Sequence, residues 1–151
     1  MNLLNLLILI PILTLGGIVF SKSQKMVRLV SASGMFLQLI AAIVIAFQYF
    51  AIRQAGDVSE MVMCMDVIWY PAFNIGYSIG VDGISIAMIL LTSIVVFAGI
   101  FASWPIENLQ KEYFISLILL AVGVFGFFIS IDLFTMFLFY ELAVIPMYLL
   151  I

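Results

Sequence analysis

The chain has 151 residues, of which 67% are hydrophobic and only 9% are charged, and this composition excludes an ordinary soluble domain. Its formal net charge is −3 and it contains no histidine, so neither a nucleic-acid-binding surface nor a histidine metal site is expected. The single cysteine, Cys64, has no partner for a disulfide within the chain, and we interpret it as a small apolar filler in a loop.

The first apolar segment, residues 3–20, is long enough to cross a membrane. The first basic residues, Lys22, Lys25 and Arg28, follow this segment instead of preceding it, which predicts a retained helix and not a signal peptide. By the positive-inside rule, the same three residues predict that the N-terminus faces outward and that loop 21–27 is cytoplasmic. Pro11 is interpreted as a tolerated kink.

A second helix is predicted over residues 27–50, and a shift in composition then predicts an outer loop over 51–80. Gln38 is interpreted as a group that hydrogen-bonds to a neighbouring helix. Near the end of the loop, residues 73–79 alternate large apolar with small or polar side chains, as in a short strand or extended segment. The aromatic residues of the loop are expected to contact other subunits or the chain's own outer surface, because they would otherwise form an exposed apolar patch.

The third and fourth helices are predicted over residues 84–103 and 112–131. Asp82 stands where the N-cap of the third helix belongs, with Ser85 three positions later, and is predicted to be a structural cap. In the fourth helix, small residues recur mostly along one face, which lets another helix approach closely. These small residues are Ser116, Gly123, Gly126 and Ser130.

The fifth helix is predicted over residues 133–151, with Asp132 as its cap. Only residues 130–133 are available to turn the chain, so the fourth and fifth helices are expected to form a tight antiparallel hairpin that buries Glu141 between helices. The last four residues are apolar, and we therefore expect a longer polypeptide. The predicted fold class is an all-α integral membrane protein with five transmembrane helices.

Glu141 is the one carboxylate in the middle of a predicted span. At a rise of 1.5 Å per residue it lies about 13 Å inside the fifth helix, close to the centre of a hydrocarbon layer about 30 Å thick. An ionisable residue at that depth is costly and indicates a functional site, here proton transfer. The alternative is a protonated, hydrogen-bonded structural carboxyl.

Pro146 follows Glu141 in the same helix and cannot donate a hydrogen bond to the carbonyl of Leu142. The freed carbonyl predicts either access for a water molecule or a simple packing kink. No lysine or arginine lies in the interior of the predicted helices. A cation that pairs with Glu141 must therefore come from a further segment or another subunit, unless the glutamate is protonated.

Four stretches, in this order along the chain, resemble the antiporter-like subunit M of bacterial NADH:quinone oxidoreductase, respiratory complex I. They are Gly80-Val81-Asp82-Gly83-Ile84-Ser85, Ala102-Ser103-Trp104, Gly123-Val124-Phe125 with Ile131-Asp132, and Glu141-Leu142-Ala143-Val144-Ile145-Pro146-Met147-Tyr148. The resemblance runs from Trp69 to Ile151, and the first 68 residues match only in their two-helix pattern. Where a tryptophan commonly precedes the glutamate, this chain has Tyr140, which we expect to be tolerated.

The resemblance implies the N-terminal part of a fourteen-helix subunit of the bacterial inner membrane that couples quinone reduction to proton translocation. It implies that Glu141 is a proton-path residue whose partner is a lysine on a seventh, broken helix outside this chain. It also implies no cofactor in this chain, with NADH, FMN, iron–sulfur clusters and quinone in other subunits. The implied partners are the other membrane-arm subunits, the remainder of the same subunit and the lipid bilayer.

Two other interpretations remain open. A cation/proton antiporter or a membrane-bound hydrogenase contains subunits of the same superfamily with the same glutamate. A small five-helix structural or assembly protein would use Glu141 only as a hydrogen-bonded core residue.

Overall fold

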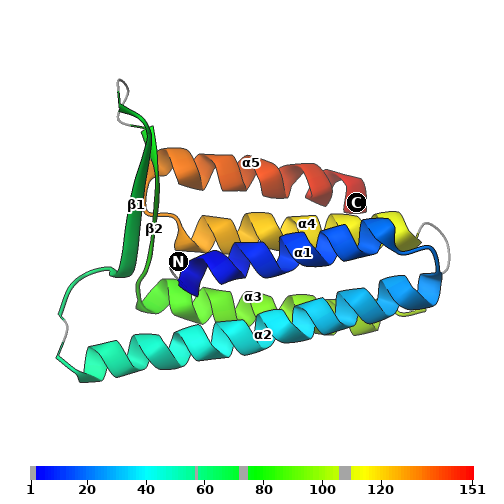
Figure 1. The fold of residues 1–151 in the computed structure, drawn as a ribbon, viewed down its shortest axis with the longest axis horizontal. Helices are drawn as coiled ribbons and strands as arrows, with labels where there is room; N and C mark the ends of the chain where they lie inside the picture. The colour runs from blue at the N-terminus through cyan, green and yellow to red at the C-terminus, as the bar shows by residue number, and fades with distance from the viewer. Residues whose placement is uncertain (1–2, 57, 72–74, 106–109) are drawn as a thin grey trace.

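Five helices, each long and apolar enough to cross a membrane, run side by side in the computed structural model, which describes residues 3–56, 58–71, 75–105 and 110–151 (Figure 1). A 3-10 turn, η1, precedes the first helix. The elements are η1 (Leu3–Asn5), α1 (Leu6–Phe20), α2 (Gln24–Gln54), α3 (Gly83–Ala102), α4 (Gln110–Ile129) and α5 (Leu133–Leu150). The chain is therefore mostly helical, and the prediction of five transmembrane helices is confirmed.

Helix α2 extends beyond residues 27–50 at both ends. It continues to Gln54 because nothing in Ala51–Gln54 breaks a helix, and it stops where Gly56 takes a positive φ of 95°. A glycine in this conformation just after the last turn is a common helix terminator.

The predicted outer loop contains a β-hairpin, made of β1 (Val62–Tyr70) and β2 (Ile75–Val81). The strands are antiparallel, with Met65 opposite Ile79 and Val67 opposite Tyr77. Strand β2 falls where the alternating residues predict an extended segment, except that Phe73 and Asn74 lie outside the described residues. Strand β1 was not predicted, since its sequence does not alternate cleanly. Cys64 is exposed on β1, so the interpretation of it as a filler in a loop was wrong.

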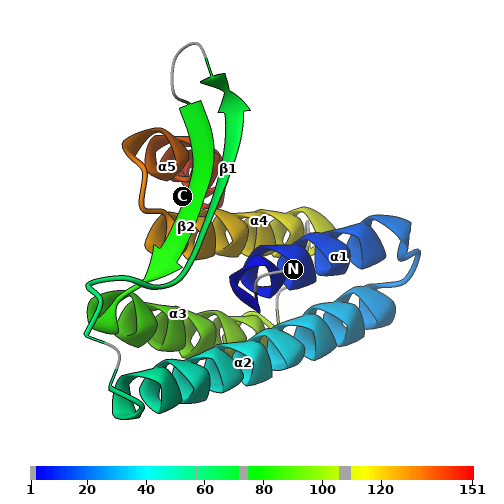
Figure 2. The same ribbon diagram turned by 60° about the vertical axis from the view of Figure 1, so that its left-hand side comes forward.

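The hairpin crosses one end of the bundle, where α1, α3 and α5 begin (Figures 1 and 2). Strand β2 contacts this end through three hydrogen bonds. The Ile131 N–H donates to the Ser78 carbonyl at 3.0 Å, the Thr135 hydroxyl to the Gly76 carbonyl at 3.1 Å, and the Tyr77 hydroxyl to Asn5 Oδ1 at 3.3 Å. The loop therefore packs on the chain's own surface at this end of the bundle, although Trp69 remains 68% exposed.

Helices α1 to α4 enclose the hydrophobic core, and α5 packs chiefly against α4. The largest buried side chains of this core come from all four of these helices and from η1 and β2. They include Met35, Ile45, Ile89, Phe114, Ile118 and Phe125. Among the five helices described, α4 is the most buried and α5 the most exposed.

Gln38 and Pro11 act together inside the bundle. Proline has no N–H, so Pro11 leaves the Leu7 carbonyl of its own helix without the usual donor. Gln38, fully buried on α2, donates from Nε2 to that carbonyl at 3.0 Å. The prediction that Gln38 hydrogen-bonds to another helix is confirmed, and its target is the gap that Pro11 creates.

We expect Gln38→Leu to destabilise the protein by about 1–3 kcal/mol, because the Leu7 carbonyl is then buried without a donor. In a Pro11→Ala background, the backbone N–H of the new alanine can donate to the Leu7 carbonyl, so the same Gln38→Leu change should cost less. A double-mutant cycle of unfolding free energies in detergent measures this coupling. Equal costs in both backgrounds would show that the two residues are independent.

Asp82 caps helix α3. Its Oδ1 accepts from the Ser85 N–H at 2.7 Å, and this backbone hydrogen bond, first among several, lowers the pKa of the carboxyl below its ordinary value of 3.8. A lowered pKa means that the stabilisation is complete above pH 3.8 and is lost as the pH falls through the folded-state value.

Asp82→Ala should therefore cost about 1 kcal/mol at neutral pH, the usual value for a lost N-cap. Asp82→Asn keeps a cap that does not titrate, so it should retain most of the stability. The measurement is the free energy of unfolding from pH 7 down to pH 3. The difference between wild type and Asp82→Asn should shrink at the acidic end, and a constant difference would contradict the role of the carboxylate.

Candidate functional site on helix α5

Close contact between α4 and α5 decides which face of α5 points inward. A Cβ atom added at Gly123 would lie 2.7 Å from the backbone nitrogen of Ala143, and one added at Gly126 would collide with the ring of Phe139. The two glycines belong to the predicted small-residue face of α4, and they let the helix backbones approach. The turn between the helices is short, and Asp132 caps α5 by accepting from the Phe134 N–H at 2.9 Å.

Glu141 lies on the opposite face of α5 and is exposed. It is two residues from both Phe139 and Ala143, and two residues turn a helix by about 200°. Because those two side chains meet the glycines of α4, Glu141 must point away from α4. The expectation that the tight hairpin buries Glu141 between helices was therefore wrong. The choice of which α5 residues meet the glycines of α4, and not the length of the turn, determines the direction of Glu141.

The surroundings of Glu141 are apolar. Along its face of α5 stand four exposed large side chains and one half-buried one, and none carries a charge. They are Phe137, Leu138, Val144, Ile145 and Tyr148. Within the described ranges, Glu141 makes no hydrogen bond or ion pair. With α5 beginning at Leu133, the carboxylate lies about 12 Å along the helix, so it occupies the middle of an open apolar face.

Pro146 and Glu141 do not meet. Pro146 is buried on the side of α5 that faces the bundle, and the helix continues through it to Leu150. The Leu142 carbonyl, four residues earlier, lies on that same inward side of α5. The structure thus places the freed carbonyl and the carboxylate on different sides of the helix.

A groove of about 320 Å³ runs between α4 and α5 on a further flank. Its lining includes Val124, Phe128, Tyr140 and Met147, and it is almost wholly apolar. Glu141 is not part of it. The groove therefore offers packing space for apolar groups.

Comparison with solved structures gives the class of protein. A chain of the membrane-bound sulfane sulfur reductase, an archaeal respiratory membrane complex, matches with a TM-score of 0.74 over 99% of this chain and 30% of that chain, at 18% sequence identity. This similarity shows that the chain shares the fold of a chain of that membrane complex, with several helices long and apolar enough to cross a membrane.

Comparison with curated proteins gives the particular relative. NADH-quinone oxidoreductase subunit M is 33% identical in Buchnera aphidicola (Schizaphis graminum) and 31% identical in Escherichia coli K12, in both cases over 99% of this chain. This chain is therefore a homologue of the N-terminal portion of subunit M, and the resemblance found in its motifs is confirmed. It spans 30% of the length of these relatives. No family model matches it.

Proposed function

We propose that this chain supplies the first helices of a proton-translocating membrane-arm subunit of NADH:quinone oxidoreductase, with Glu141 as its proton-transfer residue. The observation that carries the proposal is a single carboxylate in the middle of an open apolar face, in a homologue of subunit M. Placing a charged carboxylate at that depth in a membrane costs about 3 kcal/mol on insertion scales. We therefore infer that Glu141 has a function that offsets this cost.

The proposal requires that another segment packs on the exposed face of α5 and places a basic side chain near Glu141. The described residues give Glu141 no partner, and the basic residues lie near the helix ends. A lysine from the remainder of the subunit or from a neighbouring subunit would stabilise the ionised carboxylate, and its withdrawal would favour the protonated one. Alternation between these two states moves a proton. Pro146 leaves the Leu142 carbonyl free to hold a water on the inner side of α5, which is not the side of Glu141, so Pro146 has no direct part in this alternation.

The proposed partners follow from the same assembly. The remainder of the subunit, the adjacent membrane-arm subunits and the lipid bilayer surround this chain in a bacterial inner membrane. NADH, FMN, iron–sulfur clusters and quinone are held by other subunits, and this chain takes part in proton transfer only.

Deletion and restoration of the gene test the function. In inverted membrane vesicles, deletion should abolish NADH-driven proton uptake that is sensitive to quinone-site inhibitors, and restoration should recover it. If instead deletion removed only cation-driven proton movement and left NADH-driven uptake intact, the chain would belong to a cation/proton antiporter.

We further propose that the N-terminus faces outward. The end of the bundle opposite the hairpin has Lys22, Lys25, Arg28 and Lys111 near it, whereas the hairpin end carries Arg53 and most of the acidic residues. Basic residues favour the cytoplasmic side.

Cysteine labelling checks this orientation in a Cys64→Ser background. A membrane-impermeant reagent applied from outside should label a cysteine placed at Ser59, beside the hairpin, and should not label one placed at Ser23. The reverse pattern would overturn the orientation.

A further inference from the structure

The corner between the hairpin and the start of α5 contains a pocket of about 150 Å³. Trp69 and Tyr77 of the strands line one side of it, and Phe134, Leu138 and Phe139 of α5 line the other. In both views, the part of the hairpin where β1 ends and β2 begins extends past α5 (Figures 1 and 2). A segment that packed along α5 would therefore meet the hairpin at this pocket.

The hydroxyl groups that line the pocket are already used within the chain. The Thr135 hydroxyl donates to the Gly76 carbonyl, and the Tyr77 hydroxyl donates to Asn5 Oδ1. The rest of the lining is almost wholly apolar. Apolar cavities of about 150 Å³ accept a benzene molecule. The pocket therefore has the size and the chemistry for one phenylalanine or leucine side chain.

The pocket opens toward the face of α5 that carries Glu141. Leu138 and Phe134 stand three and seven residues before Glu141, so they share its face of the helix, and all three side chains are exposed. Lipid chains can cover the apolar side chains of this face, but they offer no partner to a carboxylate. Ionisable side chains in membrane helices almost always face protein or a water-filled cavity. A protein segment is therefore the better cover for this face.

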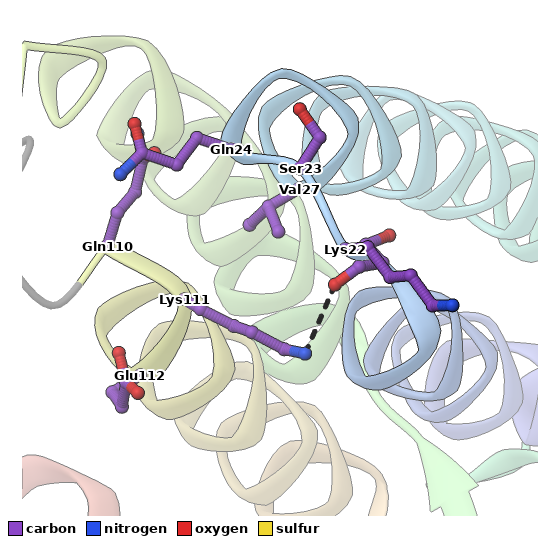
Figure 3. Close-up of a pocket in the computed structure, with 8 residues that line it drawn as sticks. Lys22, Ser23, Gln24, Val27, Gln110, Lys111 and Glu112 are labelled. Carbon is purple, nitrogen blue, oxygen red and sulfur yellow. Dashed lines mark hydrogen bonds between the residues drawn. The ribbon is translucent and has the colours of Figure 1, made fainter.

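The position beside α5 is also the open one in this bundle. At the end opposite the hairpin, the Lys111 ammonium of α4 reaches the chain leaving α1 and donates to the carbonyls of Val19 at 2.7 Å and Ser21 at 3.2 Å (Figure 3). Helices α1 to α4 are thus joined around their own core. Helix α5 packs chiefly against α4 and is the most exposed of the five helices described.

We propose that one transmembrane helix from the remainder of the subunit packs along this face of α5 and places a phenylalanine or leucine side chain in the pocket. This inference rests on the proposed function, in which the chain is the N-terminal part of a longer subunit. The same polypeptide is the favoured source, because this chain spans 30% of the length of its subunit M relatives and consecutive elements of one chain usually pack side by side.

The pocket sets the height of the covering helix relative to Glu141. Phe134 and Leu138 lie about 10 Å and about 5 Å from Glu141 along the axis of α5. The side chain in the pocket therefore stands about three to seven residues from the basic side chain that meets Glu141. The hairpin and α5 together position that cation.

Photo-crosslinking in the full-length subunit, within its native assembly, tests this packing. A p-benzoylphenylalanine at Phe134 keeps an aromatic ring at the pocket, and mass spectrometry maps its adducts. We expect adducts on one transmembrane helix of the same polypeptide, near the end of that helix on the hairpin side. Adducts on lipid alone, or on a neighbouring subunit, would overturn the proposal.

Two further positions check the direction of the covering helix and the background. The probe at Ile145, eleven residues after Phe134 on the same face, should react with the same helix about 16 Å further from the hairpin. Phe47 is an exposed phenylalanine of α2, so the probe placed there is the matched control and should give no adduct on that helix. Adducts from Phe134 and Ile145 on two different helices would contradict a single covering helix.

A change of side-chain size tests the pocket itself. Leu138→Trp should fill the pocket, displace the covering helix and remove most of its crosslinking to Ile145, whereas Leu91→Trp at an exposed position of α3 should not. Alanine in place of the apolar residue that reacts with Phe134 should restore the crosslinking of Leu138→Trp. Wild-type crosslinking in Leu138→Trp would show that the pocket stays empty.

These measurements are independent of the test of proton transfer. Crosslinking reports packing alone, so wild-type pumping in Glu141→Gln would refute the proton-transfer role and leave the packing result in place. Conversely, the absence of a covering helix in the crosslinking experiment would overturn the present inference and leave the result for Glu141→Gln unchanged. Where Leu138→Trp does not assemble, the adducts from Phe134 and Ile145 still decide the proposal.

Discussion

Replacing Glu141 with glutamine in the full-length, assembled enzyme should abolish or strongly reduce proton pumping and the quinone reduction coupled to it. Glutamine keeps the size and most of the hydrogen-bonding capacity of the side chain, but it cannot ionise. Glu141 is the one acidic residue in the middle of α5, and no other described group on its face can take over the proton. Glu141→Ala should have the same effect.

The measurement is the ratio of protons to electrons, together with NADH-dependent quinone reduction, in proteoliposomes of the purified enzyme. Glu60→Gln is the matched control, because it makes the same substitution in the exposed segment before β1 and should leave both quantities unchanged. Since Glu141 points away from α4, its replacement should not disturb the helix pair. Normal assembly with a wild-type pumping ratio in Glu141→Gln would mean that the residue is structural.

Gly123→Ala should destabilise the α4–α5 pair by about 1–3 kcal/mol, the usual cost of overpacking a core. The added methyl group would lie 2.7 Å from the Ala143 backbone nitrogen, so no side-chain rotation can relieve the clash and α5 must move. Because Ala143 is two residues from Glu141, this movement should also displace the carboxylate. We expect a lower unfolding free energy in detergent and reduced proton pumping.

Two further variants separate this packing effect from a general effect of alanine. Gly99→Ala places a methyl group near the end of α3, where nothing lies within 4 Å, and should be neutral or slightly stabilising. The atoms nearest to a methyl group added at Gly126 all belong to the Phe139 ring, so Phe139→Leu should partly restore the stability of Gly126→Ala. If Gly99→Ala and Gly123→Ala had equal effects, close helix contact would not be the cause.

The hydrophobic pattern predicted much of the fold. A membrane helix must satisfy its backbone hydrogen bonds within itself, so long apolar runs specify helices with little help from tertiary contacts. Local chemistry likewise predicted the Asp82 and Asp132 caps, since a cap depends on residues only two or three positions away. Strand β1 was not predicted from the sequence because a strand is stabilised by pairing with another segment. Here that segment is β2, which also determines the register of β1.

The amino-acid sequence alone was enough to predict that Glu141 is an isolated carboxylate at the centre of an apolar helix. Its direction away from α4 could be seen only in the folded chain, because that direction depends on which residues of α5 meet Gly123 and Gly126. The surroundings of Gln110 and Gln38 also depend on the fold. The Gln110 amide is buried without a partner among the described residues, and the Gln38 amide donates to the Leu7 carbonyl that Pro11 frees. Contacts between residues far apart in the chain depend on how the helices pack, so they cannot be predicted from composition or periodicity alone.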